Sequence, residues 1–461
     1  MVFGGADAVN PGAVVRITQK GLDYASKIGT EALEQELMSI NFPEYSGSYD
    51  LFLGSVDYDF SGMEITGIDL NSSQISFVPN AGLKFSIDQA SITVQGNWEA
   101  EYLFISDSGD FVLTVSGISI SVGLSLGSDE DGRPTVFPSD CSAYIENMDV
   151  YFSDTIDWLI NLFDDEISES LRETMESQIC PQICNAVENQ VESALQNLAV
   201  TAKLNDVVAI DFSLIAPPAV SPDSVDMDMK GEIFGIHHNS TPPFSPQPMS
   251  LPDDQNWMIY IAVSEFLFNS AGFAYQSSGM LVFNVTDDMI PKGSPVRLNT
   301  SSFGIMIPQL NKMYPNMLMK LMLTSPSAPS LNIAPGNVSL APVLEVQAYA
   351  ILPNSSLAPL FLLKLTTDIF AEVYVNSSQI VGNLKLDRVQ IELEHSDIGS
   401  FSVTMMESAM NVFISSSVLP KVNEFLRKGY PLPTLHNVTL ENVVLKLYQH
   451  YLVLGVDVHY G

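Results

Sequence analysis

The stretch LTVSGISISVGLSL, residues 113–126, decides the fold class. Apolar residues alternate along it with small polar residues, and a period of two is typical of a β-strand with one buried face. Leu113 and Val115 are out of phase with the apolar set that begins at Ile118. The phase shift falls at Ser116-Gly117, which predicts a β-bulge. Because the same period recurs over about residues 50–150, we predict long, twisted antiparallel strands in this part of the chain.

Helical periodicity flanks these strands. Residues 13–40, 154–198 and about 400–428 carry apolar side chains at three- and four-residue spacing, and the last pattern stops before Gly429 and Pro431. The second pattern is far longer than a typical helix, and Pro181 should kink it. The first helix presents a stripe of small and apolar residues that we expect to face a strand or a lipid acyl chain. These candidate lipid-pocket residues are Val14, Ile17, Gly21, Ala25 and Ile28.

The charge divides the chain in two. Residues 1–240 contain 38 acidic and 8 basic residues, a balance of −30, and residues 241–461 contain 16 and 11, a balance of −5, which together give the −35 of the whole chain. Such a negative surface repels phosphate, so it excludes nucleic acid and argues against anionic membranes. The change coincides with a proline-rich segment, so we predict an N-terminal module over 1–234, a linker over 235–254 and a C-terminal module over 255–461.

The sequons and cysteines indicate the compartment. Eight Asn-x-Ser/Thr sequons favour a secreted glycoprotein, and they lie at Asn71, Asn239, Asn284, Asn299, Asn337, Asn354, Asn376 and Asn437. Three cysteines indicate one disulfide and one free thiol. A bond between Cys180 and Cys184 would constrain little because they are one helical turn apart. A bond between Cys141 and Cys180 would close a loop of about 40 residues and contribute about 3–4 kcal/mol in the chain-entropy picture.

No motif predicts an enzyme or a metal site. Gly123-Leu124-Ser125-Leu126-Gly127 matches the G-x-S-x-G pattern, but Ser125 lies inside an alternating strand rather than at a strand–helix turn. The segment from Asp57 imitates the start of a calcium loop and has Ile68 where the loop needs Glu. The acidic turn at residues 129–131 is more typical of a solvated hairpin. The histidines are scattered, so we predict no catalytic residue, no metal and no cofactor apart from a bound lipid.

Several longer stretches resemble one known family. The segment NPGAVVRITQKGLDYAS (10–26) resembles the amino terminus of the bactericidal/permeability-increasing protein and lipopolysaccharide-binding protein family, which is related to lipid transfer proteins such as cholesteryl ester transfer protein. The resemblance continues in order along the whole chain, at LIAPPAV (214–220), MKGEIF (229–234), VSEFLFNSAGFAYQ (263–276), AYAILPNSSLAPLFLL (348–363), LKLDRVQIELEHSDIG (384–399) and GYPLPTLHNVTLENVVL (429–445).

The resemblance implies an α+β fold. Two similar modules, each a highly twisted antiparallel sheet or barrel wrapped round a long helix, would join through a central antiparallel sheet into an elongated boomerang. Each module would hold a phospholipid or similar amphiphile in an apolar pocket. The family's disulfide corresponds to Cys141 and Cys180, which leaves Cys184 free.

The chain departs from the family at the N-terminal tip. Antibacterial members carry a lysine-rich tip that binds the phosphates of lipid A, whereas residues 93–110 here contain no Lys or Arg. The candidate tip residues are Trp98, Glu99, Glu101, Tyr102 and Phe104, and we expect the three aromatic side chains to be available for insertion into a bacterial membrane. Endotoxin binding through phosphate contacts is therefore weakened, since each such contact is worth about 1.5–3 kcal/mol.

Three functions remain open from the sequence. The first is a secreted, extracellular, monomeric carrier of phospholipid-like amphiphiles, and it is the main prediction. The second is an innate-immune protein that binds lipopolysaccharide or bacterial membranes, with divalent cations bridging the acidic tip to lipid A. The third is an abundant structural or surface-active protein of a secretion, egg or foam.

Overall fold

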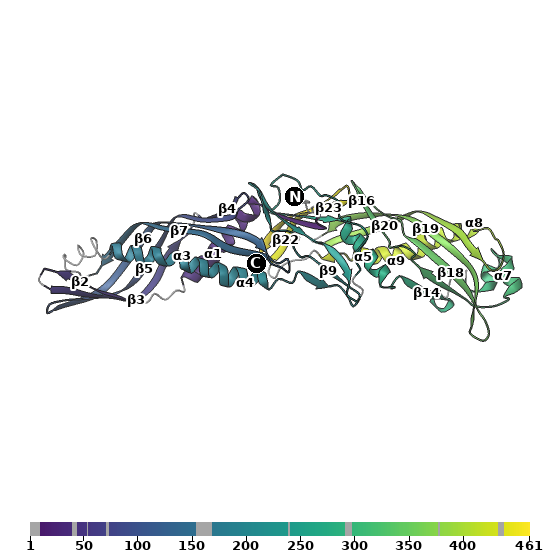
Figure 1. The fold of residues 1–461 in the computed structure, drawn as a ribbon, viewed down its shortest axis with the longest axis horizontal. Helices are drawn as coiled ribbons and strands as arrows, with labels where there is room; N and C mark the ends of the chain where they lie inside the picture. Colours follow the sequence, from purple (N-terminus) through teal and green to yellow (C-terminus); the bar gives the residue numbers. More distant parts are fainter. Residues whose placement is uncertain are drawn as a thin grey trace, which may run out of the picture.

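The computed structural model describes residues 10–38, 44–52, 54–70, 73–153, 168–237, 240–290, 297–376, 379–431 and 438–461. The molecule is elongated, with a curled sheet and a long helix at each end and a third sheet between them (Figure 1). This is the predicted α+β arrangement of two similar modules. None of the described helices is long and apolar enough to cross a lipid bilayer.

The N-terminal module is one antiparallel sheet of long strands. Its order is β2-β3-β5-β6-β7, and β4 also pairs with β5. The bounds are β2 (Tyr45–Leu51), β3 (Gly54–Asp69), β4 (Ser73–Val78), β5 (Gly82–Tyr102), β6 (Ile105–Ser128) and β7 (Pro134–Phe152). The predicted bulge is confirmed, because Ala90 pairs with Ile118 and Ser91 with Ser116, which leaves Gly117 unpaired in β5–β6 with a φ of +67°.

The C-terminal module repeats this arrangement. Its order is β14-β15-β18-β19-β17-β16, with β20 on β19 and β21 on β20. The bounds are β14 (Val282–Thr286), β15 (Met319–Thr324), β16 (Leu331–Ala334), β17 (Asn337–Leu340), β18 (Val343–Ile351), β19 (Leu357–Asn376), β20 (Gln379–Ser396) and β21 (Tyr430–Pro431). A 3-10 turn η3 (Asp287–Met289) and the short helices α6 (Thr300–Phe303) and α7 (Pro308–Met313) close its outer end.

A central sheet joins the modules with strands from both sides of the linker. Its order is β10-β11-β1-β13-β23-β22, with bounds β10 (Ala219–Val220), β11 (Ser224–Met229), β1 (Ala13–Thr18), β13 (Ile259–Ser264), β23 (Tyr451–Tyr460) and β22 (Val438–Tyr448). A small sheet of β12 (Glu232–Gly235), β9 (Val208–Asp211) and β8 (Thr201–Lys203) lies beside it.

The predicted helix over residues 13–40 is wrong at its start. Residues 13–18, which include Val14 and Ile17, form strand β1, and the helix α1 is Gln19–Leu37. The strand AVVRIT pairs with β11 on one side and β13 on the other. Its β-branched residues suit a pleated strand, and hydrogen bonds on both sides override the apparent helical spacing.

Both long helices contain a π segment. In the N-terminal module α3 (Ser168–Ala186) continues through η2 (Val187–Glu192) into α4 (Ser193–Gln196), and in the C-terminal module α8 (Thr404–Phe413) continues through η4 (Ile414–Val418) into α9 (Leu419–Arg427). Pro181 lies inside α3 without ending it, and residues 154–167 of the predicted helix lie outside the described residues. The long helix of the C-terminal module ends as predicted, with Gly429 at a φ of +74°.

The proline-rich segment is tied to both modules. Described residues 240–254 have no regular secondary structure. The Asn10 side chain donates to the Pro246 carbonyl at 3.1 Å, Arg16 donates to the Pro252 carbonyl at 2.9 Å, and the Tyr451 hydroxyl donates to the Ser250 carbonyl at 2.8 Å. These bonds fix the segment across the central sheet.

Candidate functional site

The outer end of the N-terminal module exposes four apolar side chains. Phe52 lies in the β2–β3 turn, Leu103 and Phe104 form the β5–β6 turn, and Ile105 begins β6. Phe52 and Phe104 are fully exposed, and the other two are about half exposed. The turns are neighbours because Val56 pairs with Tyr102. We call these four side chains the apolar tip. Together they form one contiguous apolar surface, which scattered single residues would not form.

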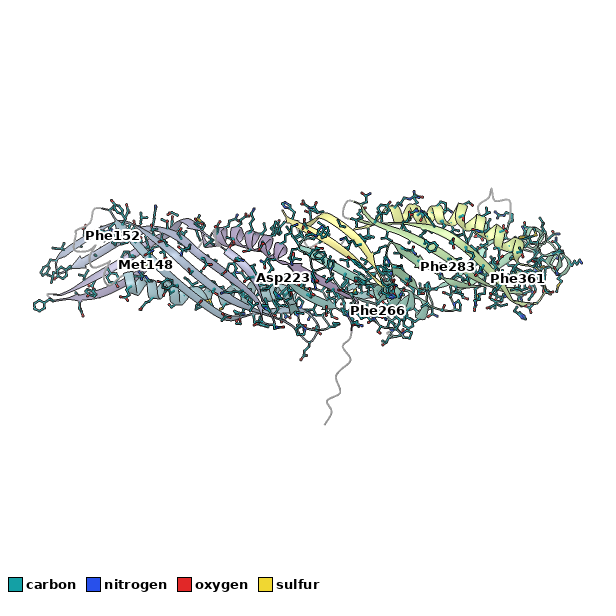
Figure 2. All side chains as sticks on the ribbon, turned by 90° about the horizontal axis from the view of Figure 1, so that it is seen from above. Met148, Phe152, Asp223, Phe266, Phe283 and Phe361 are labelled. Carbon is teal, nitrogen blue, oxygen red and sulfur yellow. A yellow bond between two sulfur atoms is a disulfide. The ribbon has the colours of Figure 1, made fainter. Side chains whose placement is uncertain are left out.

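Trp98 does not belong to this exposed surface. It is 3% exposed and packs edge-on against Phe152, with ring centroids 5.7 Å apart, in the core beneath the apolar tip. Figure 2 shows Phe152 in this end of the molecule. The expectation that Trp98 could insert into a membrane is therefore wrong, because β5 turns it inward together with Ala100. Tyr102 is half-buried against the same core, and Phe104 alone of the three predicted aromatics is free in solvent.

Carboxylates line the outer face of the sheet behind the apolar tip. Glu99 and Glu101 are exposed on β5, directly opposite Asp59 and Asp57 of β3. Like charges in opposite cross-strand positions destabilise a sheet slightly and concentrate negative potential. We call these four residues the acidic face. A surface of this sign repels phosphate, so contact with anionic headgroups costs energy at this end of the molecule.

The predicted pocket stripe is divided among three environments. Val14 is buried in the central sheet, Ile17 packs against Leu22, and Gly21 lies so close to strand β13 that an added Cβ would be 2.7 Å from the Met258 carbonyl oxygen. Farther along α1, Ala25 is exposed and Ile28 is half-buried.

The far end of this helix faces solvent. Gly29 is exposed, and a Cβ added there would meet nothing within 4 Å. The near end of the stripe therefore packs against protein, whereas Ala25, farther along it, lies at the surface.

The disulfide joins the long helix to the sheet edge. Cys141 of β7 bonds to Cys180 of α3, and Cys184 is free and half-buried. Two hydrogen bonds support the same junction, since the Ile145 N–H donates to Glu176 at 2.7 Å and the Val136 N–H donates to Glu192 at 2.7 Å. The pairing that the resemblance implied is confirmed.

A buried carboxylate joins the modules at the central sheet. Asp457 of β23 accepts hydrogen bonds from Lys20 of α1 at 2.8 Å, from the Asn442 side chain at 3.0 Å and from the Met258 N–H at 3.0 Å. Burial alone would raise the pKa of Asp457, but the three donors outweigh it and hold the pKa below its ordinary value. Sequence reasoning missed this residue because its donors are far away along the chain.

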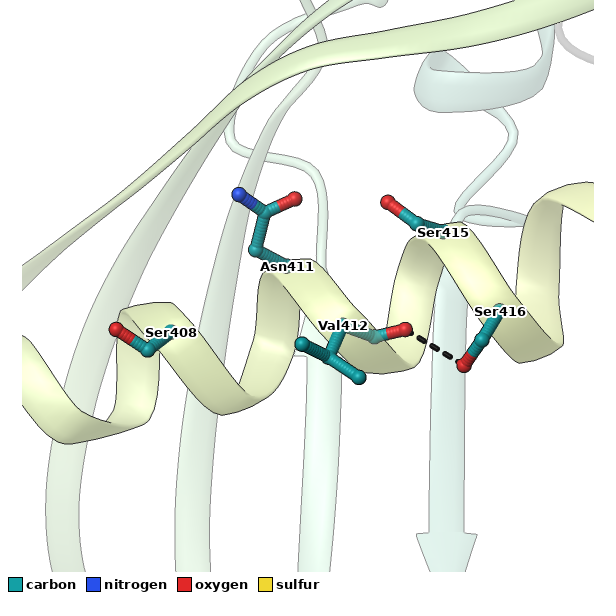
Figure 3. A pocket seen from close by; sticks show the side chains of 5 residues that line it. All are labelled: Ser408, Asn411, Val412, Ser415 and Ser416. Carbon is teal, nitrogen blue, oxygen red and sulfur yellow. Dashed lines mark hydrogen bonds between the residues drawn. The ribbon is translucent and has the colours of Figure 1, made fainter.

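The long C-terminal helix borders an open depression of about 530 Å³. It is lined by Ser408, Asn411, Val412, Ser415 and Ser416 (Figure 3). All five side chains are exposed, and the Ser416 hydroxyl donates to the Val412 carbonyl at 2.7 Å. An open surface of this kind, with four hydroxyl or amide side chains among its five, does not resemble an enclosed acyl-chain pocket.

The sequons occupy several environments. Asn284, Asn354 and Asn376 are exposed, Asn299 and Asn337 are half-buried, and Asn71, Asn239 and Asn437 lie outside the described residues. The side-chain oxygen of Asn299 accepts from the Ser302 N–H and caps α6, and that of Asn354 accepts from Ser356 in a hairpin turn. Whether these sequons carry glycans stays a prediction.

The weak motifs have structural explanations. Ser125 lies within β6, and Asp57 lies within β3. In the acidic turn, Asp129 accepts from the N–H groups of Arg133 and Asp131 at 2.7 and 2.9 Å, so its carboxylate is already satisfied. The described residues contain no group of three or more His, Cys, Asp or Glu side chains arranged to hold a metal ion.

Comparison with known proteins gives a consistent result over the whole chain. The N-terminal domain of the LBP / BPI / CETP family matches residues 21–198, and the C-terminal domain matches residues 202–460. The chain is 40% identical to the lipopolysaccharide-binding protein of Mus musculus, covering 99% of this chain and 95% of that protein. It is 38% identical to the bactericidal permeability-increasing protein of Sebastes schlegelii, covering 98% and 96%.

A solved structure agrees with these similarities. The crystal structure of a lipopolysaccharide-binding protein superimposes with a TM-score of 0.66 at 38% identity, covering 98% of this chain and all of that one.

Proposed function

The chain belongs to the LBP / BPI / CETP family, and from this premise we propose that it is a secreted lipid-binding protein that docks on lipid surfaces by its apolar tip. The observation that carries the proposal is the full exposure of Phe52 and Phe104 on adjacent turns at one end of an elongated molecule. Apolar side chains gathered on adjacent turns form a contiguous exposed patch, and such a patch is typical of a surface that contacts a membrane, a ligand or another protein. No catalytic activity is proposed.

The apolar tip can supply useful binding energy. Burying one large apolar side chain contributes about 1.5–3 kcal/mol. Transfer of both phenylalanines into a lipid interface therefore contributes at least about 3 kcal/mol, or ~150-fold in partitioning. Binding of this strength is reversible, as a carrier that visits a surface and leaves it requires.

The acidic face selects the lipid surface. Its four carboxylates lie directly behind the apolar tip, so an anionic surface is repelled whereas a zwitterionic or neutral one is not. We infer that the preferred surface carries phosphocholine-type headgroups. Salt weakens the repulsion and leaves the apolar contribution, so added salt brings binding to anionic vesicles closer to that of zwitterionic ones.

The interior is proposed to hold the acyl chains of a phospholipid-like amphiphile. In the N-terminal module this location rests on the half-buried Ile28 of α1, whereas Ala25 and Gly29 are exposed to solvent. The repeated sheet-and-helix arrangement supports a second pocket in the C-terminal module. Each buried methylene contributes about 0.8 kcal/mol, so a single acyl chain outweighs the polar contacts.

Lipopolysaccharide is a second candidate ligand, favoured by the names of the relatives at 37–40% identity. Its acyl chains would contact the same apolar tip, but its phosphates would then lie beside the acidic face and be repelled by it. We propose that this binding requires a divalent cation between the two. Binding of lipopolysaccharide at equal strength with and without calcium would exclude the bridge, and absence of binding in both conditions would exclude lipopolysaccharide.

Vesicle flotation tests the docking proposal. The double variant Phe52→Ser/Phe104→Ser should lose about two orders of magnitude of partitioning into phosphatidylcholine vesicles. Tyr144→Ser is the matched control, because Tyr144 is an exposed aromatic on β7 away from the turns. Equal binding of the double variant and the control would contradict docking by the apolar tip.

Lipid mass spectrometry tests the interior. Solvent extraction of the protein purified from its secreted source should release a stoichiometric amphiphile. Finding none would remove the carrier proposal and leave vesicle docking as a separate question.

A further inference from the structure

Among the residues that the structure describes, the sheet edges are protected from pairing with other chains, with one exception. An unpaired edge strand offers free N–H and C=O groups to another chain, so proteins cover such edges, charge them or keep them short. In this molecule the long helices cover β7 and β20. Glu176 and Glu192 accept from β7, and on β20 the Ile391 N–H donates to Glu407 at 2.9 Å while Asn423 bonds to both backbone groups of Leu384.

The other described edges are protected by similar means. Helix α5 (Glu265–Ser277) caps β16 and β12: Asn269 bonds to both backbone groups of Leu331, and the Ile233 N–H donates to Ser270 at 2.9 Å. Gln19 of α1 donates to the Ile75 carbonyl of β4. The remaining edges are very short or carry charge or a bulge, namely β10, β8 with Lys203, β2 with Asp50, and β22 with a bulge after Glu441.

Strand β14 has none of these protections. It lies at the edge of the C-terminal sheet, and its sequence VFNVT carries no charge. Its register with β15 is continuous, without a bulge. No described side chain bonds to its backbone, and its first three residues are exposed, with Val282 at 46% and Phe283 at 63%. Figure 2 shows Phe283 in the C-terminal module, whose half of the chain has a balance of only −5 and so repels a second copy weakly.

The exposed strand carries a sequon at its centre. Asn284-Val285-Thr286 lies wholly within β14, and Asn284 is exposed. We propose that Asn284 bears an N-linked glycan that covers the β14 edge and prevents two copies of the chain from pairing through it. A glycan is bulky and hydrated, so it blocks the approach of a second strand where the sequence supplies no charge to do so.

The other described sequons differ from Asn284 in what a glycan could cover. Asn299 caps a helix, Asn337 is half-buried in the inner strand β17, Asn354 lies in a turn, and Asn376 is the last residue of β19, which carries charged side chains. None of these four lies in an uncharged edge strand. A glycan at Asn284 would therefore cover an unprotected strand edge, which a glycan at the other described sequons would not.

Glycopeptide mass spectrometry and light scattering test the proposal on the full chain secreted from eukaryotic cells. Asn284 should be occupied and the protein monomeric. Asn284→Gln and Thr286→Ala, which remove the sequon in different ways, should both shift the mass to that of two or more chains. Thr286→Ser keeps the sequon, and Ser356→Ala removes the sequon at Asn354, so both should stay monomeric.

A rescue variant identifies the surface that associates. Val282 lies on the same face of β14 as Asn284, so a lysine there charges the edge. The double variant Asn284→Gln/Val282→Lys should return to the monomer. An unoccupied Asn284, a monomeric Asn284→Gln protein, or failure of the lysine to restore the monomer would each overturn the proposal.

Discussion

Removing the Asp457 carboxylate should loosen the junction between the two modules. The side chain is almost fully buried and accepts from three segments: α1 through Lys20, the β22 strand through Asn442, and the start of β13 through the Met258 N–H. In Asp457→Ala the half-buried Met258 N–H loses its acceptor, whereas the exposed Asn442 side chain regains water. A buried donor left unsatisfied costs about 1–3 kcal/mol.

The expected destabilisation is about 2 kcal/mol, from the one shielded donor left without an acceptor. Lys20 adds little to it, because its side chain is 41% exposed and regains water when the pair is broken. The matched control is Asp206→Ala, which breaks the exposed ion pair with Lys203 and should leave the free energy of unfolding unchanged. Urea unfolding measures the free energy of unfolding of both variants, and hydrogen exchange of the native protein measures the local stability of the central sheet.

The same residue predicts a pH dependence. Because the pKa of Asp457 in the folded protein lies below its ordinary value, its stabilisation is present above about pH 4 and is lost as the pH falls through the folded pKa. Asp457→Asn should remove this part of the acid sensitivity. Equal destabilisation by the Asp457 and Asp206 variants, or an unchanged acid dependence in Asp457→Asn, would refute the reasoning.

Three further predictions concern the N-terminal module. Cys180→Ser should destabilise the protein by about 4 kcal/mol in the chain-entropy picture, and Cys184→Ser should not, as unfolding under non-reducing conditions will reveal. Trp98→Ala should cost about 3–5 kcal/mol of unfolding free energy through the cavity that it leaves, whereas Phe104→Ser should leave the melting temperature unchanged, and the reverse order would contradict the assigned burial. Glu176→Ala should lower the free energy of unfolding by about 1–2 kcal/mol and speed hydrogen exchange at the Ile145 N–H, which donates to Glu176. Glu176→Gln keeps an acceptor oxygen and should retain most of the exchange protection.

The alternation of side chains along β5 predicts which of the tip residues are buried. Glu99 and Glu101 must face solvent, so Trp98 and Tyr102 face the opposite side of the same strand, which is the core. The apolar tip could not be assembled from the sequence in this way. Phe52 and Leu103 are neighbours only because β3 pairs with β5 in a particular register, and a shift of one residue would separate the turns.

The sequence by itself determined the features that depend on neighbouring residues. The period of two along 113–126 set the long strands, Gly117 set the bulge, and Gly429 ended the last helix, because backbone sterics and alternation act over a few residues. Only the tertiary structure decided that residues 13–18 form a strand, since β11 and β13 pair with them from more than 200 residues away. It also decided that Lys20 meets Asp457 and that β14 alone among the described edges lies uncovered, because such contacts follow from packing that no local pattern encodes.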